Sequence, residues 1–137
     1  MKFFTYPGFT EGLSTHSHYS QSLRLNNKIH TSGQGGWNQS TGQIPTSIKE
    51  EINQAFTNVE TVLKSAGGKG WTEVYKVNLY YTKEIATEEG ISVLGEIMKK
   101  FCGEQHRPLL TAVEVAGLAL QGMRIEVEVS ALVEGEE

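Results

Sequence analysis

Residues 47–66 carry the clearest helical pattern in the chain. Their apolar residues recur every three or four positions and therefore share one face of a helix. They are Ile48, Ile52, Ala55, Phe56, Val59, Leu63 and Ala66. Ser47 followed by Glu50 fits a capping box, and Gly67-Gly68 ends the segment with residues that tolerate positive φ. The pattern predicts a helix whose apolar face packs against a core.

A second helical stripe follows Glu88 and Glu89, whose negative charges suit a helix N-terminus. Its apolar positions are Ile91, Leu94, Ile97, Met98 and Phe101. Lys99 and Lys100 stand in its last turn, where positive charge is favourable. This segment predicts a second amphipathic helix.

Five segments have the pattern of β-strands, bounded by turn residues. They cover residues 19–25, 28–34, 71–82, 109–116 and 123–133. In the last segment, one face is expected to carry Met123, Ile125, Val127, Val129, Ala131 and Val133. Its other face is expected to carry Arg124, Glu126, Glu128 and Ser130. In the 71–82 segment, one face is expected to carry Tyr75, Val77, Leu79 and Tyr81.

The order of these elements, β-β-α-β-α-β-β, predicts an α+β fold with a mixed sheet. Residues 1–17 are aromatic and contain glycine, and they leave room for one more short strand. We expect both helices to cover one face of the sheet, since that buries both apolar stripes. The opposite face then requires either water or another subunit.

Composition narrows the class of protein. The chain of 137 residues is 38% hydrophobic and 20% charged, which fits a single globular domain over residues 1–137. Twelve Lys and Arg against 16 Asp and Glu give a formal net charge of −4, without the basic stripe typical of nucleic-acid binders. With no signal peptide and no long apolar run, we expect a soluble, cytoplasmic protein that does not contact membranes.

Metal and thiol chemistry have little support in the sequence. Cys102 is the single cysteine, and it is expected to act as a small apolar residue near a helix end. His16 and His18 could reach one metal ion, but no acidic or thiolate third ligand is nearby. We therefore expect no metal site.

Glu126 and Glu128 are the most suggestive pair of side chains. They share one face of the predicted last strand, roughly 6.5–7 Å apart along the chain. Two carboxylates at this spacing can serve in acid and base catalysis. They can equally form a solvated face balanced by Arg124, and the pattern alone leaves both interpretations open.

Short motifs in the same order along the chain resemble the Rid (YjgF-like) family. They are His18-Tyr19-Ser20-Gln21, Ser32-Gly33-Gln34, Gln54-Ala55-Phe56 with Asn58, Val77-Asn78-Leu79-Tyr80, Thr111-Ala112-Val113-Glu114-Val115-Ala116 and Ile125-Glu126-Val127-Glu128-Val129. Each motif is short, but the ordered set is specific and runs from about Tyr19 to Val133.

The resemblance implies a chorismate-mutase-like fold and a homotrimer with ligand clefts between adjacent subunits. The activity implied is hydrolysis of reactive enamines and imines, such as 2-aminoacrylate, to 2-keto acids and ammonia. No metal or organic cofactor takes part in that reaction. Older descriptions of the family speak of endoribonuclease L-PSP or of translation inhibition.

The resemblance also implies roles for single residues. Tyr19 matches the tyrosine of the family's cleft, and Ser32 and Gly33 match a wall lined by backbone. Glu126 matches the glutamate that positions or activates the attacking water. Trp37 either lines the mouth of the cleft or anchors its loop.

The chain departs from the family at the residues that recognise the substrate. The pattern P-A-R-[ST] reads Pro108-Leu109-Leu110-Thr111 here, so Leu110 replaces the arginine that holds the substrate carboxylate. Leu110, Thr111 and Ala112 are the expected substrate-binding residues of this segment. An asparagine common in the second helix is also replaced, by Leu94.

Two other arginines are candidates to replace the lost one. Pro108 separates Arg107 from the strand, and alternation is expected to turn Arg107 to the other face from Leu110. Arg124 is expected to share the face of Glu126.

Three functions from different classes follow. The first is an enzyme that acts on a small imine or enamine other than a 2-imino acid. The second is a non-catalytic trimer that binds a small hydrophobic ligand or a protein partner. The third is a ribonuclease, which the acidic charge makes the weakest of the three.

Overall fold

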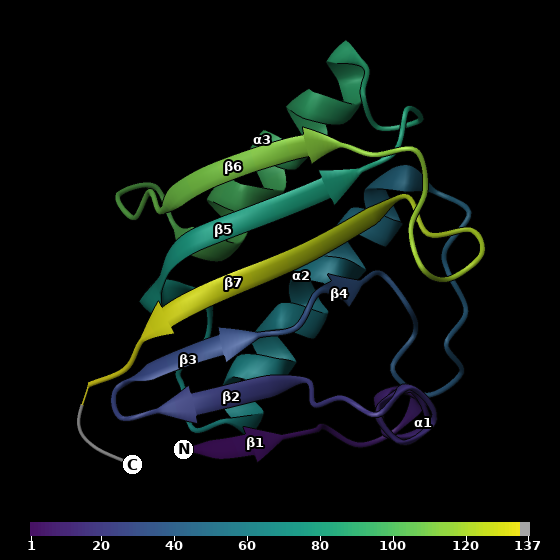
Figure 1. The fold of residues 1–137 in the computed structure, drawn as a ribbon. Coiled ribbons are helices and arrows are strands. Elements are labelled where there is room, and N and C mark those ends of the chain that lie inside the picture. The colour runs from purple at the N-terminus through teal and green to yellow at the C-terminus, as the bar shows by residue number, and fades with distance from the viewer. Residues whose placement is uncertain (135–137) are drawn as a thin grey trace.

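The computed structural model describes residues 1–134 as a mixed sheet backed by two long helices (Figure 1). In chain order the elements are β1 (Lys2–Phe4), α1 (Phe9–Ser17), β2 (Ser22–Leu25), β3 (Lys28–Thr31), β4 (Gln34–Gly35), α2 (Ile48–Ser65), the 3₁₀ turn η1 (Trp71–Glu73), β5 (Val74–Tyr81), α3 (Glu88–Cys102), β6 (Leu109–Glu114) and β7 (Ile125–Leu132). The predicted α+β class is confirmed, and so is the packing of α2 and α3 on one face of the sheet (Figure 1).

The seven strands form one sheet in the order β1-β2-β3-β7-β5-β6, and β4 also pairs with β7. Strand β7 is therefore central, and it is antiparallel to β3, β4 and β5. Strand β6 lies at an edge and is parallel to β5. The chain's last described strand thus places its residues in the middle of the sheet.

The core forms between the apolar face of β7 and the apolar stripes of α2 and α3. All six apolar residues expected on one face of the last strand are between 0% and 6% exposed. Phe56 of α2 stacks on Trp71 with ring centroids 4.6 Å apart and planes 12° apart. Burial of each large apolar side chain contributes about 1.5–3 kcal/mol, so these two stripes and one strand hold the fold together.

Helix boundaries agree with the capping signals. Ser47 precedes α2, and its hydroxyl accepts a hydrogen bond from the Glu50 backbone N–H at 3.3 Å. At the start of α3, the Thr87 hydroxyl accepts one from the Gly90 N–H at 3.0 Å. None of the helices within residues 1–134 has both the length and the apolar character needed to cross a membrane.

All five predicted strands are shorter in the structure than expected. The 19–25 segment begins its strand only at Ser22, and the 28–34 segment breaks at Ser32 and Gly33 into β3 and β4. At the start of β5, a register irregularity between Val74 and Lys76 leaves Val74 in the core at 0% exposure, whereas Tyr75 is 37% exposed. The expectation that Tyr75 shares one face with Val77 and Leu79 was therefore wrong, because a bulge interrupts the strict alternation of side chains.

Helix α1 was not predicted, because it has almost no apolar stripe. Thr10 is its one buried residue. The helix begins after Gly8, whose φ of 100° favours glycine, and the Glu11 carboxylate accepts a hydrogen bond from the Gly8 N–H at 2.9 Å. His18 ends it in the left-handed region at φ 56°. Capping contacts, rather than burial, define this helix.

The sheet face away from the helices, here called the open face, carries polar side chains at its centre and the exposed apolar Leu109 and Val113 at the β6 edge. The His30 ring and the Ser130 hydroxyl are 2.9 Å apart across β3 and β7. Arg124 was expected on this face, and that expectation was wrong. Its guanidinium instead donates to the Glu51 carboxylate of α2 at 2.6 Å, and its backbone N–H donates to the same carboxylate at 2.7 Å. Arg124 precedes the first residue of β7, so strand alternation does not control it.

Candidate functional site

A cavity of about 440 Å³ opens beside the central strand. It lies where α1, the β3–β4 turn and the β6–β7 loop approach β7. Five of the residues predicted for the site line it, namely Tyr19, Ser32, Gly33, Trp37 and Glu126. Leu13, Ser17, Ala119, Leu120, Met123 and Glu128 complete its lining. We call this space the acidic cavity.

Glu126 is the best-positioned carboxylate of the acidic cavity. Its backbone pairs with Gly35 on one side and with Tyr80 on the other, so the residue is fixed inside the sheet. Burial raises the pKa of the Glu126 carboxyl above its ordinary value, and the negative charge of Glu128 raises it further. Within residues 1–134 the carboxylate has no recorded hydrogen bond or ion pair. Such a group can accept a proton or a ligand N–H.

Gly33 is required by the close approach of this carboxylate. A Cβ atom at position 33 would lie 2.6 Å from Cδ and 2.7 Å from Cγ of Glu126. Any other residue would therefore force the Glu126 carboxyl to move. The break of the predicted 28–34 strand at this point makes room for the site.

Glu128 differs from Glu126 because one oxygen of its carboxylate already accepts two hydrogen bonds. It accepts hydrogen bonds from the Asn78 amide at 3.0 Å and from the Tyr80 hydroxyl at 2.8 Å. The bond to Glu128 raises the pKa of Tyr80 above its ordinary value. Both donors come from β5, so Glu128 is held across the open face.

A buried hydrogen-bond chain supports the floor of the cavity. The Trp37 indole donates to the Tyr6 hydroxyl at 3.1 Å, and that hydroxyl donates to Gln34 Oε1 at 2.7 Å. Gln34 then donates to Gln21, which donates to the Ser14 hydroxyl of α1. Trp37 is only 2% exposed, so it both anchors its loop and lines the cavity. Burial raises the pKa of Tyr6, which keeps this phenol neutral.

Ser32 and Tyr19 stand nearer the rim. The Ser32 hydroxyl donates to the Ser20 carbonyl at 2.7 Å, so its proton is engaged and its oxygen remains an acceptor. Tyr19 is 38% exposed, and no side-chain hydrogen bond of its phenol is recorded within residues 1–134. The Tyr19 hydroxyl is therefore available to a ligand.

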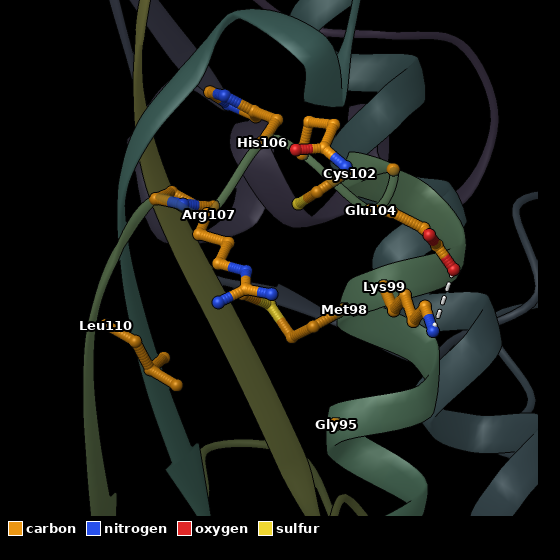
Figure 2. Close-up of a pocket in the computed structure, with 11 residues that line it drawn as sticks. Gly95, Met98, Lys99, Cys102, Glu104, His106, Arg107 and Leu110 are labelled. Carbon is orange, nitrogen blue, oxygen red and sulfur yellow. Dashed lines mark ion pairs between the residues drawn. The ribbon is translucent and has the colours of Figure 1, made fainter.

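A second cavity, of about 360 Å³, lies between α3 and the start of β6 (Figure 2). We call it the basic cavity, since Lys99, His106 and Arg107 line it together with the single acid Glu104. Lys99 pairs with Glu104 at 2.9 Å. Within residues 1–134, the exposed Arg107 has no recorded ion pair. Figure 2 shows its side chain directed toward Met98 of α3.

Leu110 lines the basic cavity, not the acidic one. Its neighbour across the sheet is Val77 of the core face, so Leu110 points toward the helices. Arg107 lines the same cavity, and the expectation that it turns away from Leu110 was wrong. It precedes β6 and Pro108 redirects the chain, so alternation does not apply to it.

The other two predicted residues of β6 point in opposite directions. Thr111 is the neighbour of Asn78 and belongs to the open face, whereas Ala112 is the neighbour of the buried Leu79. Neither lines the acidic cavity of its own chain. The two halves of the predicted site therefore lie apart within one chain.

Cys102 and the histidines do not form a reactive or metal-binding group. Cys102 ends α3 at 5% exposure, and burial raises the pKa of its thiol to about 11. The thiol thus stays protonated and behaves as the expected small apolar residue. Residues 1–134 contain no cluster of three or more His, Cys, Asp or Glu side chains suited to a metal ion.

Comparison with known proteins identifies the family. The sequence model of the Endoribonuclease L-PSP family matches residues 9–133. The chain belongs to this family, the Rid or YjgF-like proteins. The expected fold is confirmed by the crystal structure of RidA from a Psychrobacter species, which has a TM-score of 0.74 and 29% identity over 84% of this chain and 88% of that one.

Two curated relatives carry the name 2-iminobutanoate/2-iminopropanoate deaminase. The protein from Dermatophagoides farinae is 32% identical over 117 residues, which cover 85% of this chain and 86% of the relative. The protein from Rattus norvegicus is 34% identical over 115 residues, which cover 83% of this chain and 79% of the relative.

Sequence reasoning missed Tyr6, Leu120 and Met123 as residues that build the acidic cavity or its floor. Tyr6 lies in the segment that gave no periodic pattern, and Leu120 lies in a loop. Met123 was assigned to the core face of its strand, and it does reach 5% exposure there while also lining the cavity. No local signal distinguishes such residues, because tertiary contacts create their role.

Proposed function

We propose that this protein is a small-molecule imine hydrolase of the Rid family that acts on imines or enamines other than 2-imino acids. The observation that carries the proposal is the Glu126 carboxylate, which has no partner among residues 1–134 and shares its cavity with the motif residues Tyr19, Ser32 and Gly33. The deaminase relatives support the class of reaction. Leu110 in place of the family's arginine supports the change of substrate.

The reaction needs one base and one proton donor. Water forms a bond from its oxygen to the imine carbon and gives a proton to Glu126. Glu126 then returns this proton to the nitrogen of the adduct. As the C–N bond breaks and ammonia leaves, the hydroxyl group of the adduct gives its proton to Glu126 and becomes the carbonyl of the product, and ammonia finally takes up that proton. The raised pKa of Glu126 suits both steps, because it makes the carboxylate a better proton acceptor than an ordinary glutamate.

We further propose that the working form is a homotrimer whose clefts join two chains. Strand β6 is an unpaired edge, with Leu109 69%, Leu110 50% and Val113 44% exposed. Exposed apolar edges of this kind are usually covered. The acidic cavity of one copy and the basic cavity of another have complementary charges, which favours a second copy as the cover.

Light scattering tests the assembly at micromolar concentration. The proposal predicts a mass three times the chain's 15.1 kDa. A monomer mass under these conditions contradicts the shared cleft.

The alternative is a trimer that binds a small hydrophobic ligand or protein partner without catalysis, and Leu110 favours it as well. Release of ammonia from a panel of imines separates the two proposals. Turnover that depends on Glu126 supports the hydrolase, whereas ligand binding without turnover of any imine supports the alternative.

A further inference from the structure

The acidic cavity combines two carboxylates with apolar walls. Glu126 and Glu128 line it, and Leu13, Leu120 and Met123 supply much of the remaining surface. Among the described residues that line it there is no Lys, Arg or His. The field inside this cavity is therefore negative, and its dielectric is lower than that of water.

The two carboxylates are not equally available to a ligand. Glu128 already accepts bonds from Asn78 and Tyr80. Glu126 accepts none that is recorded within residues 1–134. A ligand N–H that enters the cavity would meet Glu126 as its acceptor, with Glu128 adding long-range attraction for positive charge.

We propose that the acidic cavity selects a cation, namely a protonated imine or a primary ammonium group that carries an aliphatic substituent and no carboxylate. The inference rests on the proposed function and names its substrate class. The charged N–H donates to Glu126, which is among the stronger kinds of hydrogen bond. The aliphatic part packs against Leu120 and Met123 and loses contact with water. In the lining that one chain supplies, a carboxylate on the ligand would face two like charges and no cation, and Leu110 of a covering copy would bring no donor where the family has its arginine.

The cavity size agrees with a ligand of this class. Its volume of about 440 Å³ lies in the usual range for small-molecule sites, roughly 300–1,000 Å³. A chain of four or five carbon atoms with one nitrogen fits this space. Trp37, which is anchored on Tyr6, supplies a fixed wall.

Binding of three matched probes tests this selection without any need for turnover. Butylammonium, butan-1-ol and butyrate share a chain length and differ in charge, and each is titrated into the natural protein at pH 7.5 by ligand-observed NMR. Butylammonium should bind saturably and at least tenfold more tightly than either other probe. Glu126→Gln should weaken that binding at least tenfold, whereas Glu96→Gln, which removes an exposed charge on α3, should leave it unchanged.

Each outcome bears on the inference separately from the hydrolase proposal. Equal or tighter binding of butyrate overturns it, and so does butylammonium binding that Glu126→Gln leaves intact in a folded protein. Selective butylammonium binding without hydrolysis of any imine supports the inference and contradicts the hydrolase. Hydrolysis with a preference for imines that carry a carboxylate supports the hydrolase and overturns the inference.

Discussion

The acidic and basic cavities differ in charge and in how firmly their residues are held. Glu126 sits on the central strand, paired on both sides and packed against Gly33. Leu110 sits on the edge strand at 50% exposure, and Arg107 lies in the segment before it (Figure 2). Groups on rigid elements are positioned more accurately than groups on loops or edges. We therefore expect the rigid centre of the sheet to fix the position of Glu126, whereas residues at its edge, such as Leu110, can change at little structural cost.

The largest expected effect is that of removing the charge of Glu126. For any imine that the protein hydrolyses, Glu126→Gln should lower turnover by about 10²–10⁴-fold, as is usual for loss of a general acid or base. Glu128→Gln should do less, because one oxygen of Glu128 already accepts hydrogen bonds from Asn78 and Tyr80. Steady-state ammonia release measures both variants. Small and equal losses of turnover in the two variants would indicate that Glu126 and Glu128 only form a solvated face.

Gly33→Ala tests whether the position of the carboxylate matters as much as its presence. The added Cβ would overlap the Glu126 carboxyl and displace it. A displacement of about 1 Å can cost on the order of 10²-fold in rate, while the flexible side chain lets the fold survive.

Gly12→Ala in α1 is the matched control, since no neighbouring atom lies within 4 Å of a Cβ at this position and Gly12 lines neither cavity. This control should keep its activity and gain up to about 1 kcal/mol in free energy of unfolding. Chemical denaturation and the ammonia assay together measure both variants. Equal activities of the two would contradict the importance of the Gly33 contact.

Leu110→Arg tests whether Leu110 on the edge strand β6 prevents the protein from hydrolysing imines that carry a carboxylate. The natural protein should hydrolyse 2-iminopropanoate negligibly, and the variant should gain about 30-fold or more, since a buried charged hydrogen bond is worth roughly 2–5 kcal/mol. Leu109→Arg is the control, because its neighbour Lys76 marks the other side of β6. Robust activity of the natural protein that Arg107→Leu abolishes would instead make Arg107 the carboxylate-binding residue.

The smallest expected effect is on the pH dependence of turnover. Catalysis by an ionised Glu126 is lost as the pH falls through its pKa, which lies above the ordinary value. Glu128, Tyr80 and Tyr19 are the titratable groups near it. Glu128→Gln removes a like charge, so it should lower the pKa of Glu126 and move the acidic limb of the profile to lower pH. Because Glu126 stays buried in this variant, the acidic limb should still lie at a higher pH than the limb that an exposed glutamate would produce. An unmoved or raised limb would contradict this coupling.

The sequence predicted the parts of the fold that periodicity controls. The alternation of the last strand and the stripes of the two long helices correctly identified the core and placed Glu126 on the opposite face. Periodicity failed to predict α1, which is defined by its capping contacts, and the direction of Tyr75, which is set by a bulge in β5.

The same limit applies to the candidate site. The motif residues Tyr19, Ser32, Gly33 and Glu126 do meet in one cavity, although their roles stay predictions. The two arginines were misplaced because each lies just before a strand, where long-range partners such as Glu51 decide the direction of a side chain. Alternation carries no information at such positions.

Two imines that differ by a carboxylate test most directly the proposal that the acidic cavity hydrolyses imines without a carboxylate. An amine oxidase generates the imine of 3-methylbutylamine in situ, and an amino-acid oxidase generates the 2-imino acid of leucine, each in competition with semicarbazide. The natural protein should reduce trapping of the first imine and leave the second unaffected, and Glu126→Gln should abolish the reduction. Preferential loss of the 2-imino acid would contradict the account.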